Sequence, residues 1–319
     1  MEHSVNDEGW GGRNSGSPQR DPLSCADGAA TAGREHRPPS APPLRAALGA
    51  SDPCREVTLD GVRVTFDDEG RGQTVVCLHA IGHGARDFAT FRERNRHRYR
   101  VLALDWPDHG RSAPDRIEPS SARYGEILAM FLDALVLDRP LLLGNSIGGA
   151  AALRVAAARP DRVRAVVVAN PGGLVPHALS KRLVTGAVAG FFALGKPASR
   201  WYPNAFAALY RRILSEPPAS EQRARIVAAW AESAPVLARA WRSFGQPDDD
   251  LSASLERISC PVLVTWSVGD RLNPLAFNRP GIGRLPKARL ETFRGGHAPF
   301  LECPEEFDAA FERFVQGLP

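Results

Sequence analysis

Three side chains suited to nucleophilic catalysis stand in glycine-rich surroundings along this chain. Ser146 lies within Gly-Asn-Ser-Ile-Gly, Asp270 follows Ser-Val-Gly, and His297 follows Gly-Gly. A serine hydroxyl is a weak nucleophile at neutral pH, so it needs a neighbouring base. An imidazole base in turn needs an acid that fixes its tautomer and stabilises its charge. These residue types therefore predict a triad with Ser146 as nucleophile, His297 as base and Asp270 as the orienting acid.

The stretch from 140 to 158 predicts the local geometry around Ser146. A short apolar run, Pro-Leu-Leu-Leu, leads into the glycine-flanked serine, and small residues with helical spacing follow it. This pattern is typical of a strand, a sharp turn and a helix, with the serine in strained backbone. Side chains at Gly144 and Gly148 would collide with the adjacent strand and helix. The start of the helix leaves the backbone N–H of Ile147 available to stabilise an oxyanion.

The elements that must position these residues follow from the hydrophobic pattern. Two runs of alternating β-branched or apolar and polar residues, joined by Asp60-Gly61, predict a hairpin. Strands that then alternate with helices predict an α/β fold with a mostly parallel sheet flanked by helices on both faces. The predicted strands are 56–59, 62–66, 74–79, 100–105, 140–144, 163–169, 261–266 and 288–293, and the predicted helices in this part are 120–137, 147–158 and 305–315.

Four regions are predicted along the chain. Residues 1–54 are rich in Gly, Pro, Ser, Ala and Arg and are expected to form a disordered N-terminal extension. Residues 55–172 and 253–319 are expected to form the two parts of the α/β core. The interval 173–252 shows only helical periodicity and is expected to lie over the carboxyl ends of the strands as a helical cap, where open parallel sheets bind ligands. Most of its aromatic residues are expected to form its own core.

Composition limits the classes of partner. The net charge is +4, and the one dense basic run, 92–100, is expected to be a solvated helix end rather than a phosphate-binding surface. The five cysteines have no metal-ligand spacing, and no stretch approaches the ~20 apolar residues of a membrane span. No secretory signal is evident. We therefore expect a cytoplasmic monomer or homodimer that acts on a small molecule, with no metal, cofactor, nucleic acid or membrane partner.

Residues 55–319 resemble the α/β-hydrolase family. The resemblance is to members that have a serine nucleophile and a helical cap. The resemblance rests on strings in the family's order: Leu78-His79-Ala80-Ile81, Asp105-Trp-Pro-Asp-His-Gly-Arg-Ser112, Gly144-Asn-Ser-Ile-Gly148, Trp266-Ser-Val-Gly-Asp270, and Gly296-His297 with Pro304-Glu-Glu-Phe307. It implies that Ser146, Asp270 and His297 form the triad. The implied oxyanion donors are the backbone N–H groups of Ile81 and Ile147.

Four further residues receive roles from position and from the resemblance. His83 and Asn145 are candidate pocket residues, and Asn145 is expected to pack beside the serine turn. His79 and His109 are expected to hydrogen-bond loops rather than to act in catalysis. The family's usual His-Gly after the third strand is His-Ala at positions 79 and 80, and this departure bears on the path of the loop that carries Ile81.

The serine nucleophile favours acyl transfer over the chemistry of dehalogenases and epoxide hydrolases, which need a carboxylate. The sequence predicts a hydrolase that cleaves a small carboxylic ester or lactone through an acyl-enzyme. A carbon-carbon bond hydrolase of the meta-cleavage type is an alternative, because its serine turn is similar. Arg211 or Arg212 would then hold the substrate carboxylate. A non-catalytic ligand-binding protein on the same fold is a further alternative, since fold does not fix function.

Overall fold

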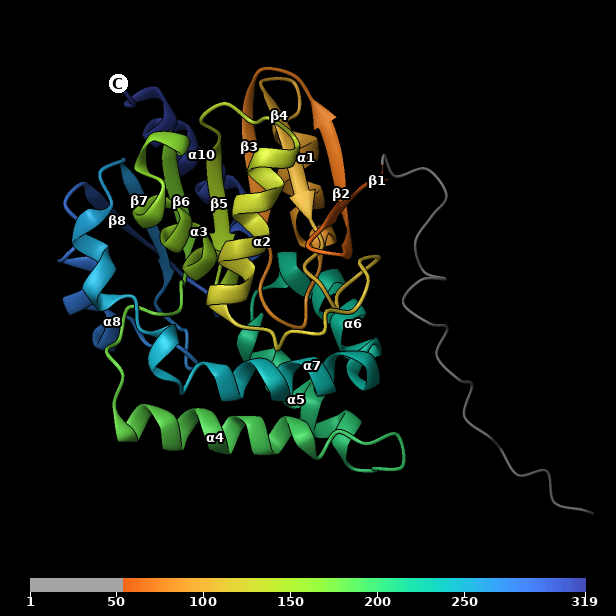
Figure 1. Cartoon of the computed structure of the whole chain (residues 1–319). Helices are drawn as coiled ribbons and strands as arrows, with labels where there is room; N and C mark the ends of the chain where they lie inside the picture. The colour runs from red at the N-terminus through yellow and green to blue at the C-terminus, as the bar shows by residue number, and fades with distance from the viewer. Residues whose placement is uncertain (1–53) are drawn as a thin grey trace, which may run out of the picture. The chain divides into compact units, whose positions relative to one another are not determined.

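An eight-stranded, mostly parallel sheet organises the part of the chain, residues 54–319, that the computed structural model describes (Figure 1). The strand order is β1-β2-β4-β3-β5-β6-β7-β8. Strand β2 is antiparallel to β1 and β4, and all other pairs are parallel. The strands are β1 (Cys54–Leu59), β2 (Val62–Gly70), β3 (Gln73–Leu78), β4 (Tyr99–Leu104), β5 (Leu141–Asn145), β6 (Ala165–Ala169), β7 (Val262–Ser267) and β8 (Ala288–Phe293).

The α/β fold class predicted from the sequence is confirmed, and each predicted strand is present within a few residues. The hairpin turns at Asp60 and Gly61, whose φ angles of 49° and 76° are those that a tight two-residue hairpin requires. The apolar run of β3 is fully buried from Val75 to Leu78, as expected of a strand covered on both faces. The predicted disordered extension lies outside the described residues, apart from Cys54, which begins β1.

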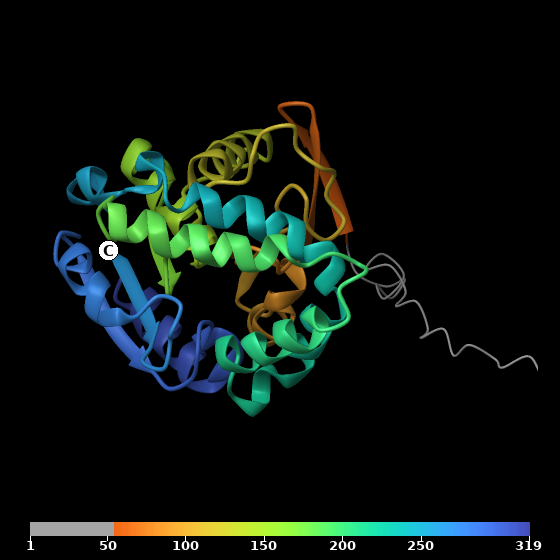
Figure 2. The same ribbon diagram turned by 90° about the horizontal axis from the view of Figure 1, so that it is seen from below.

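Helices cover both faces of this sheet (Figures 1 and 2). The hydroxyl of Ser120 caps α2 (Ser121–Ala134) by accepting a hydrogen bond from Arg123 N at 3.0 Å. This helix ends before the predicted residue 137, because Val136 has a φ of 51° and leaves the helical conformation. The helices outside the interval between β6 and β7 are α1 (Ala89–Asn95), α2 (Ser121–Ala134), α3 (Ile147–Ala158), α8 (Leu275–Ile282), α9 (Pro299–Glu302) and α10 (Pro304–Gln316).

The interval between β6 and β7 contributes four α-helices that lie together below the carboxyl ends of the parallel strands (Figure 1). They are α4 (Leu179–Ala193), α5 (Tyr202–Ile213), α6 (Ser220–Ala228) and α7 (Trp230–Ser243). Phe192, Tyr202 and Phe206 are buried between them, as expected of the interval's own core. Leu183 and Trp201 were part of the same periodic pattern, but both are exposed. The domain boundaries at 173 and 252 stay a prediction.

Candidate active site

Ser146 occupies the sharp turn between β5 and α3, with strained backbone angles of φ 54° and ψ −116°. A non-glycine residue in this region costs energy and persists only where its surroundings hold it. Its N–H donates to Ala169 O at 2.9 Å, which ties the turn to the end of β6. A side chain at Gly144 would meet the backbone of Gly148 at 2.5 Å, and one at Gly148 would meet Leu78 O at 2.3 Å. The glycines therefore allow the close approach that the sequence predicted.

Asp270 and His297 form a hydrogen-bonded pair at the same edge of the sheet. His297 Nδ1 lies 2.6 Å from Asp270 Oδ2. The other carboxylate oxygen accepts from the backbone N–H groups of Leu272 and Asn273 at 2.9 and 3.0 Å. Because Nδ1 faces a carboxylate, it carries the ring proton, and Nε2 is left to accept a proton from a substrate or a nucleophile.

Opposing effects set the pKa of His297. Its burial alone would lower the pKa, because a charged imidazolium loses its hydration. The negative charge of Asp270, the hydrogen bond to it and the more distant charge of Glu302 outweigh that effect. The pKa of His297 is therefore raised above its ordinary value, and its ring stays protonated to a higher pH than a free imidazole.

Asn145 connects the serine turn to the histidine loop. Its Nδ2 donates to Ala169 O and to His297 O, both at 2.9 Å, and its side chain is fully buried. The residue before Ser146 thus holds the backbone of His297 directly. This position beside the turn agrees with the sequence prediction, and a contact of Asn145 with substrate stays a prediction. The structure brings Ser146, Asp270 and His297, which follow β5, β7 and β8, to one edge of the sheet.

Two neutral histidines hold the loop after β3. Trp106 N donates to His79 Nε2 at 2.9 Å, so the proton of His79 is on Nδ1 and is donated to Ala80 O at 2.7 Å. Gly82 N donates to His109 Nε2 at 2.9 Å. Burial lowers the pKa of His79 well below its ordinary range and that of His109 to about 4. Both rings therefore serve as uncharged hydrogen-bonding partners of the loop backbone, as the resemblance implied.

The left-handed residue of this loop is Gly82, with a φ of 76°, and not the residue at position 80. Alanine therefore fits at position 80 without strain, which resolves the departure seen in the sequence. Ile81 and Ile147 are both buried, with 6% and 1% of their surface exposed. Within residues 54–319, neither backbone N–H has a hydrogen-bond acceptor. Both groups are thus available as donors, and their role as oxyanion donors stays a prediction.

His83 lies between the loop after β3 and the inserted helices α6 and α7. Its Nδ1 is 2.5 Å from the buried Asp87 Oδ2. Asp87 also accepts from two side chains of α6, Gln222 and Arg225, with Arg225 at 3.2 Å. His83 lines a cavity of about 70 Å³ between this loop and the helices α6 and α7. This network joins the loop that carries Ile81 to α6, and contact of His83 with substrate stays a prediction.

The first residue that sequence reasoning missed is Asn170, which follows β6. Its Nδ2 donates to Asp270 Oδ2 at 2.6 Å, and its Oδ1 accepts from Ser267 N at 3.1 Å. The residue is fully buried with a φ of 46°, a conformation that asparagine tolerates better than most residues. Asn170 therefore holds the carboxylate in place from a neighbouring strand. Its position directly after a predicted strand was the only available signal.

The second missed residue is Glu302, whose fully buried carboxylate holds the histidine loop. It accepts from Gly296 N at 2.9 Å and from Ala298 N at 3.1 Å, the residues on either side of His297. It also accepts from Ser215 N at 2.7 Å and Glu216 N at 3.2 Å, in the segment that follows α5. One carboxylate thus holds the loop of His297 and the segment after α5 together. The spacing of five residues from His297 was its only sequence signal.

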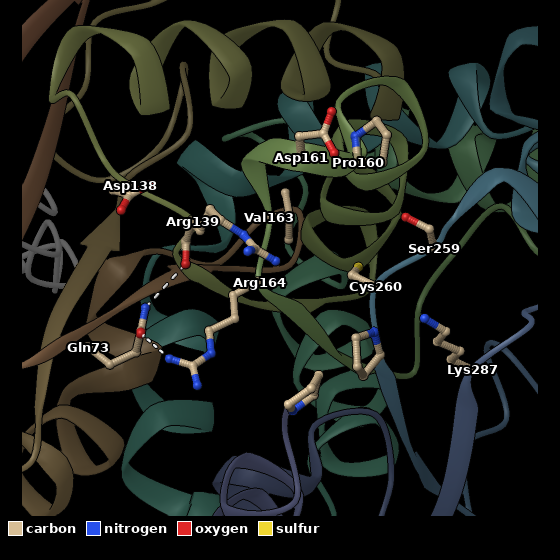
Figure 3. A pocket seen from close by; sticks show the side chains of 12 residues that line it. Gln73, Asp138, Arg139, Pro160, Asp161, Val163, Arg164, Ser259, Cys260 and Lys287 are labelled. Atoms are coloured by element: carbon tan, nitrogen blue, oxygen red, sulfur yellow. Dashed lines mark hydrogen bonds between the residues drawn. The ribbon is translucent and has the colours of Figure 1, made fainter.

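A second cavity, of about 390 Å³, lies away from this site at the amino ends of the strands (Figure 3). Gln73 stands at its wall, where it donates to Arg139 O at 3.2 Å and accepts from Arg164 at 2.7 Å. Ser146, Asp270 and His297 are not among its lining residues. Over the described range 54–319, no group of three or more His, Cys, Asp or Glu side chains is arranged to hold a metal ion. No helix in that range has both the length and the apolar character needed to cross a bilayer.

Comparisons with known proteins agree with this geometry. The sequence model of the alpha/beta hydrolase family matches residues 75–310. A Caulobacter sp. (strain K31) protein provisionally named carbamate hydrolase RutD is 30% identical over 263 residues, covering 77% of this chain and 91% of that protein. The 2-hydroxy-6-oxo-6-phenylhexa-2,4-dienoate hydrolase of Burkholderia cepacia is 29% identical over 79% of this chain and 91% of its own length. A thermophilic esterase from Thermogutta terrifontis has the same fold, with a TM-score of 0.70 at 20% identity over 82% of this chain and 98% of that one.

Proposed function

The chain belongs to the alpha/beta hydrolase family, and from this premise we propose that it is a serine hydrolase of small carboxylic esters or lactones. The observation that carries the proposal is the 2.6 Å pair of His297 and Asp270 at the sheet edge where Ser146 sits in strained backbone. Asn145 adds support, because it holds the backbone of His297 beside the serine turn. The three residues have the types, the order along the chain and the local geometry that acyl transfer to water requires.

In the proposed reaction, Ser146 Oγ attacks the carbonyl carbon while His297 Nε2 takes the hydroxyl proton. Asp270 stabilises the imidazolium that forms, and Asn170 keeps that carboxylate in place. The N–H groups of Ile81 and Ile147 donate to the oxyanion, each worth roughly 10² to 10³ in turnover. The imidazolium then gives its proton to the leaving alcohol, and water repeats the sequence on the acyl-enzyme.

The helices α4 to α7 serve in this proposal as a cap that shapes the substrate pocket. Three contacts with the core support that role. Leu237 lies against Gly82, with its side chain 3.0 Å from where a Cβ would stand. The rings of His83 and Tyr210 are 5.9 Å apart, and Arg239 pairs with Asp108 at 3.0 Å. The apolar and aromatic character of the cap favours a small, fairly apolar substrate.

A carbon-carbon bond hydrolase of the meta-cleavage type is the second candidate. The likeness to the Burkholderia cepacia hydrolase supports it. The exposed positions of Arg211 and Arg212 count against it, because these were the cap residues expected to hold a substrate carboxylate. The partly buried Arg225 lies beside the loop after β3, but it is already paired with Asp87 at 3.2 Å.

Active-site labelling tests the proposal. The full chain is treated with a fluorophosphonate and examined by intact mass and peptide mapping, and hydrolysis of short p-nitrophenyl esters is measured in parallel. We expect the label on Ser146, and we expect both labelling and turnover to be lost in Ser146→Ala. The matched control is Ser112→Ala, whose hydroxyl donates to Asp105 O away from the serine turn. A folded chain that takes no label and turns over no ester would overturn the proposal in favour of ligand binding.

A further inference from the structure

Helix α4 is the inserted helix farthest from the sheet in Figure 1, and its outward face is apolar and exposed within the described part of the chain. Its inner face packs on α7 through Thr185, Ala189 and Phe192. On its outer side, Leu179, Leu183 and Val184 are 70%, 65% and 62% exposed. Apart from Ser180 and Arg182, every exposed residue of this helix is apolar or glycine. A continuous apolar face of this kind on a surface helix marks an interaction site.

Two further large apolar side chains are exposed in the segment that joins α4 to α5. Leu194 directly follows α4 and is 52% exposed, and Trp201 precedes α5 and is 53% exposed. Tryptophan is enriched where an apolar phase meets water, because its ring is apolar and its N–H is polar. We call the surface formed by Leu179, Leu183, Val184, Leu194 and Trp201 the α4 face.

The chain segment that carries the α4 face has charges of one sign. Residues 162–215 contain no aspartate or glutamate. Arg182, Lys196 and Arg200 are exposed, and within the described part of the chain no carboxylate pairs with any of them. Lys181 is different, because it pairs with the buried Asp249 at 3.0 Å. An apolar helix face bordered by unpaired cations is the pattern of a helix that lies in the surface of an anionic membrane.

We propose that the α4 face docks on an anionic phospholipid surface, with the helix lying in the plane of the headgroups. The basic border favours this occupant over a second copy of the chain. Gly186 and Gly190 have open space above them and would let another helix approach closely. A symmetric pair of α4 faces would, however, bring the cations of the two copies together. The proposal differs from the sequence-based expectation of no membrane partner. It does not conflict with the finding that no helix within residues 54–319 could span a bilayer, because a helix that lies in the membrane surface needs no spanning segment.

Vesicle flotation tests the proposal on the full chain, with phosphatidylcholine vesicles and with vesicles that also contain phosphatidylglycerol. We expect binding to the anionic vesicles, weaker binding to the neutral ones, and loss of binding as salt is raised. Leu183→Glu should lower the partition coefficient at least about tenfold, because it places a charge in the apolar face. The triple change of Arg182, Lys196 and Arg200 to Gln should lower it about 100-fold, at about fivefold for each cation.

Two controls keep these outcomes separate from loss of fold or of activity. Phe277→Glu makes the same kind of change at a side chain that is 69% exposed on α8, outside the α4 face, and should leave vesicle binding unchanged. All variants should keep the wild-type melting temperature and turnover of a water-soluble ester. Equal binding to both vesicle types, or unaltered binding of Leu183→Glu, would overturn the proposal. A third outcome would also overturn it. In that outcome the chain floats with neither vesicle type, forms a dimer in sedimentation equilibrium, and loses that dimer in Leu183→Glu.

Discussion

Replacing Glu302 by glutamine tests whether one buried carboxylate holds His297, the proposed catalytic base, in place. The substitution keeps the shape of the side chain and removes its charge. One oxygen can still accept from Ser215 N and Gly296 N, as Oε1 does now. The other becomes an NH₂ group that faces the N–H of Ala298, which now donates to Oε2 at 3.1 Å. Glu302→Gln therefore turns hydrogen bonds to a charged acceptor into a contact between two donors.

The expected loss of stability follows from those contacts. A hydrogen bond to a charged group contributes about 1.5 to 3 kcal/mol, and a buried donor left without an acceptor adds a penalty. We expect Glu302→Gln to lower the free energy of unfolding by about 2 to 4 kcal/mol. For a chain of this size, that corresponds to a fall in melting temperature of roughly 5 to 15 °C. Displacement of the histidine loop should lower kcat by about 10- to 100-fold.

The pH profile separates a positioning role from loss of fold. The charge of Glu302 helps to raise the pKa of His297, so its removal should lower that pKa. Turnover requires the neutral imidazole, and the rising limb of kcat/KM should therefore move to lower pH in Glu302→Gln. Glu302→Asp retains the charge and should keep the wild-type midpoint, although its shorter side chain loses hydrogen bonds.

The matched control is Glu305→Gln on the same segment. Its side chain is 86% exposed, and its nearest cation is Arg94 at 3.8 Å. Such a pair contributes little, so both melting temperature and turnover should stay at the wild-type values. The reasoning is refuted if Glu302→Gln melts and turns over like this control, or if it lowers turnover with no change in the pH midpoint.

Three further outcomes are expected. In the wild type, kcat/KM for an ester should rise with pH around a midpoint above the ordinary imidazole value of about 6.5, because the pKa of His297 is raised and the neutral base appears only at higher pH. A midpoint at or below that value would contradict the assignment of the base. Asn170→Gly should lower kcat about 10- to 100-fold, because it removes the side chain that holds the Asp270 carboxylate while glycine tolerates the φ of 46°. An unchanged kcat in a folded variant would exclude the positioning role of Asn170. Val136→Gly should raise the free energy of unfolding by about 1 kcal/mol in urea titrations, because an exposed β-branched residue with a φ of 51° is strained. The control Ala134→Gly, at the end of α2, should not stabilise the protein.

Much of the fold and the core of the site could be predicted from local patterns. The strands and flanking helices follow from hydrophobic period and turn residues, which act over a few positions. Gly144 and Gly148 indicated the strained serine turn for the same reason, since they allow contacts that the turn itself creates. Asp270 and His297 were predicted because each follows a strand, and the carboxyl ends of parallel strands meet at one edge. The family's order of motifs then implied which role each side chain takes in the proposed triad.

The contacts that hold the site together could not be predicted in this way, because they join segments far apart in the chain. Asn170 and Asp270 are 100 positions apart, and Glu302 and Ser215 are 87 apart. Nothing in the local pattern of either member of a pair specifies its partner.

The sequence by itself determined the α/β fold, the serine turn and the residue types of the proposed triad, because those depend on local sterics and on strand order. The tertiary structure decided which buried side chains hold the proposed triad and which face of the inserted helices is exposed. Phe192 and Leu183 both follow the helical period of α4, and only the packing of α4 on α7 buries the first and exposes the second. Burial depends on what lies across an interface, and that information is not contained in the spacing of residues along one helix.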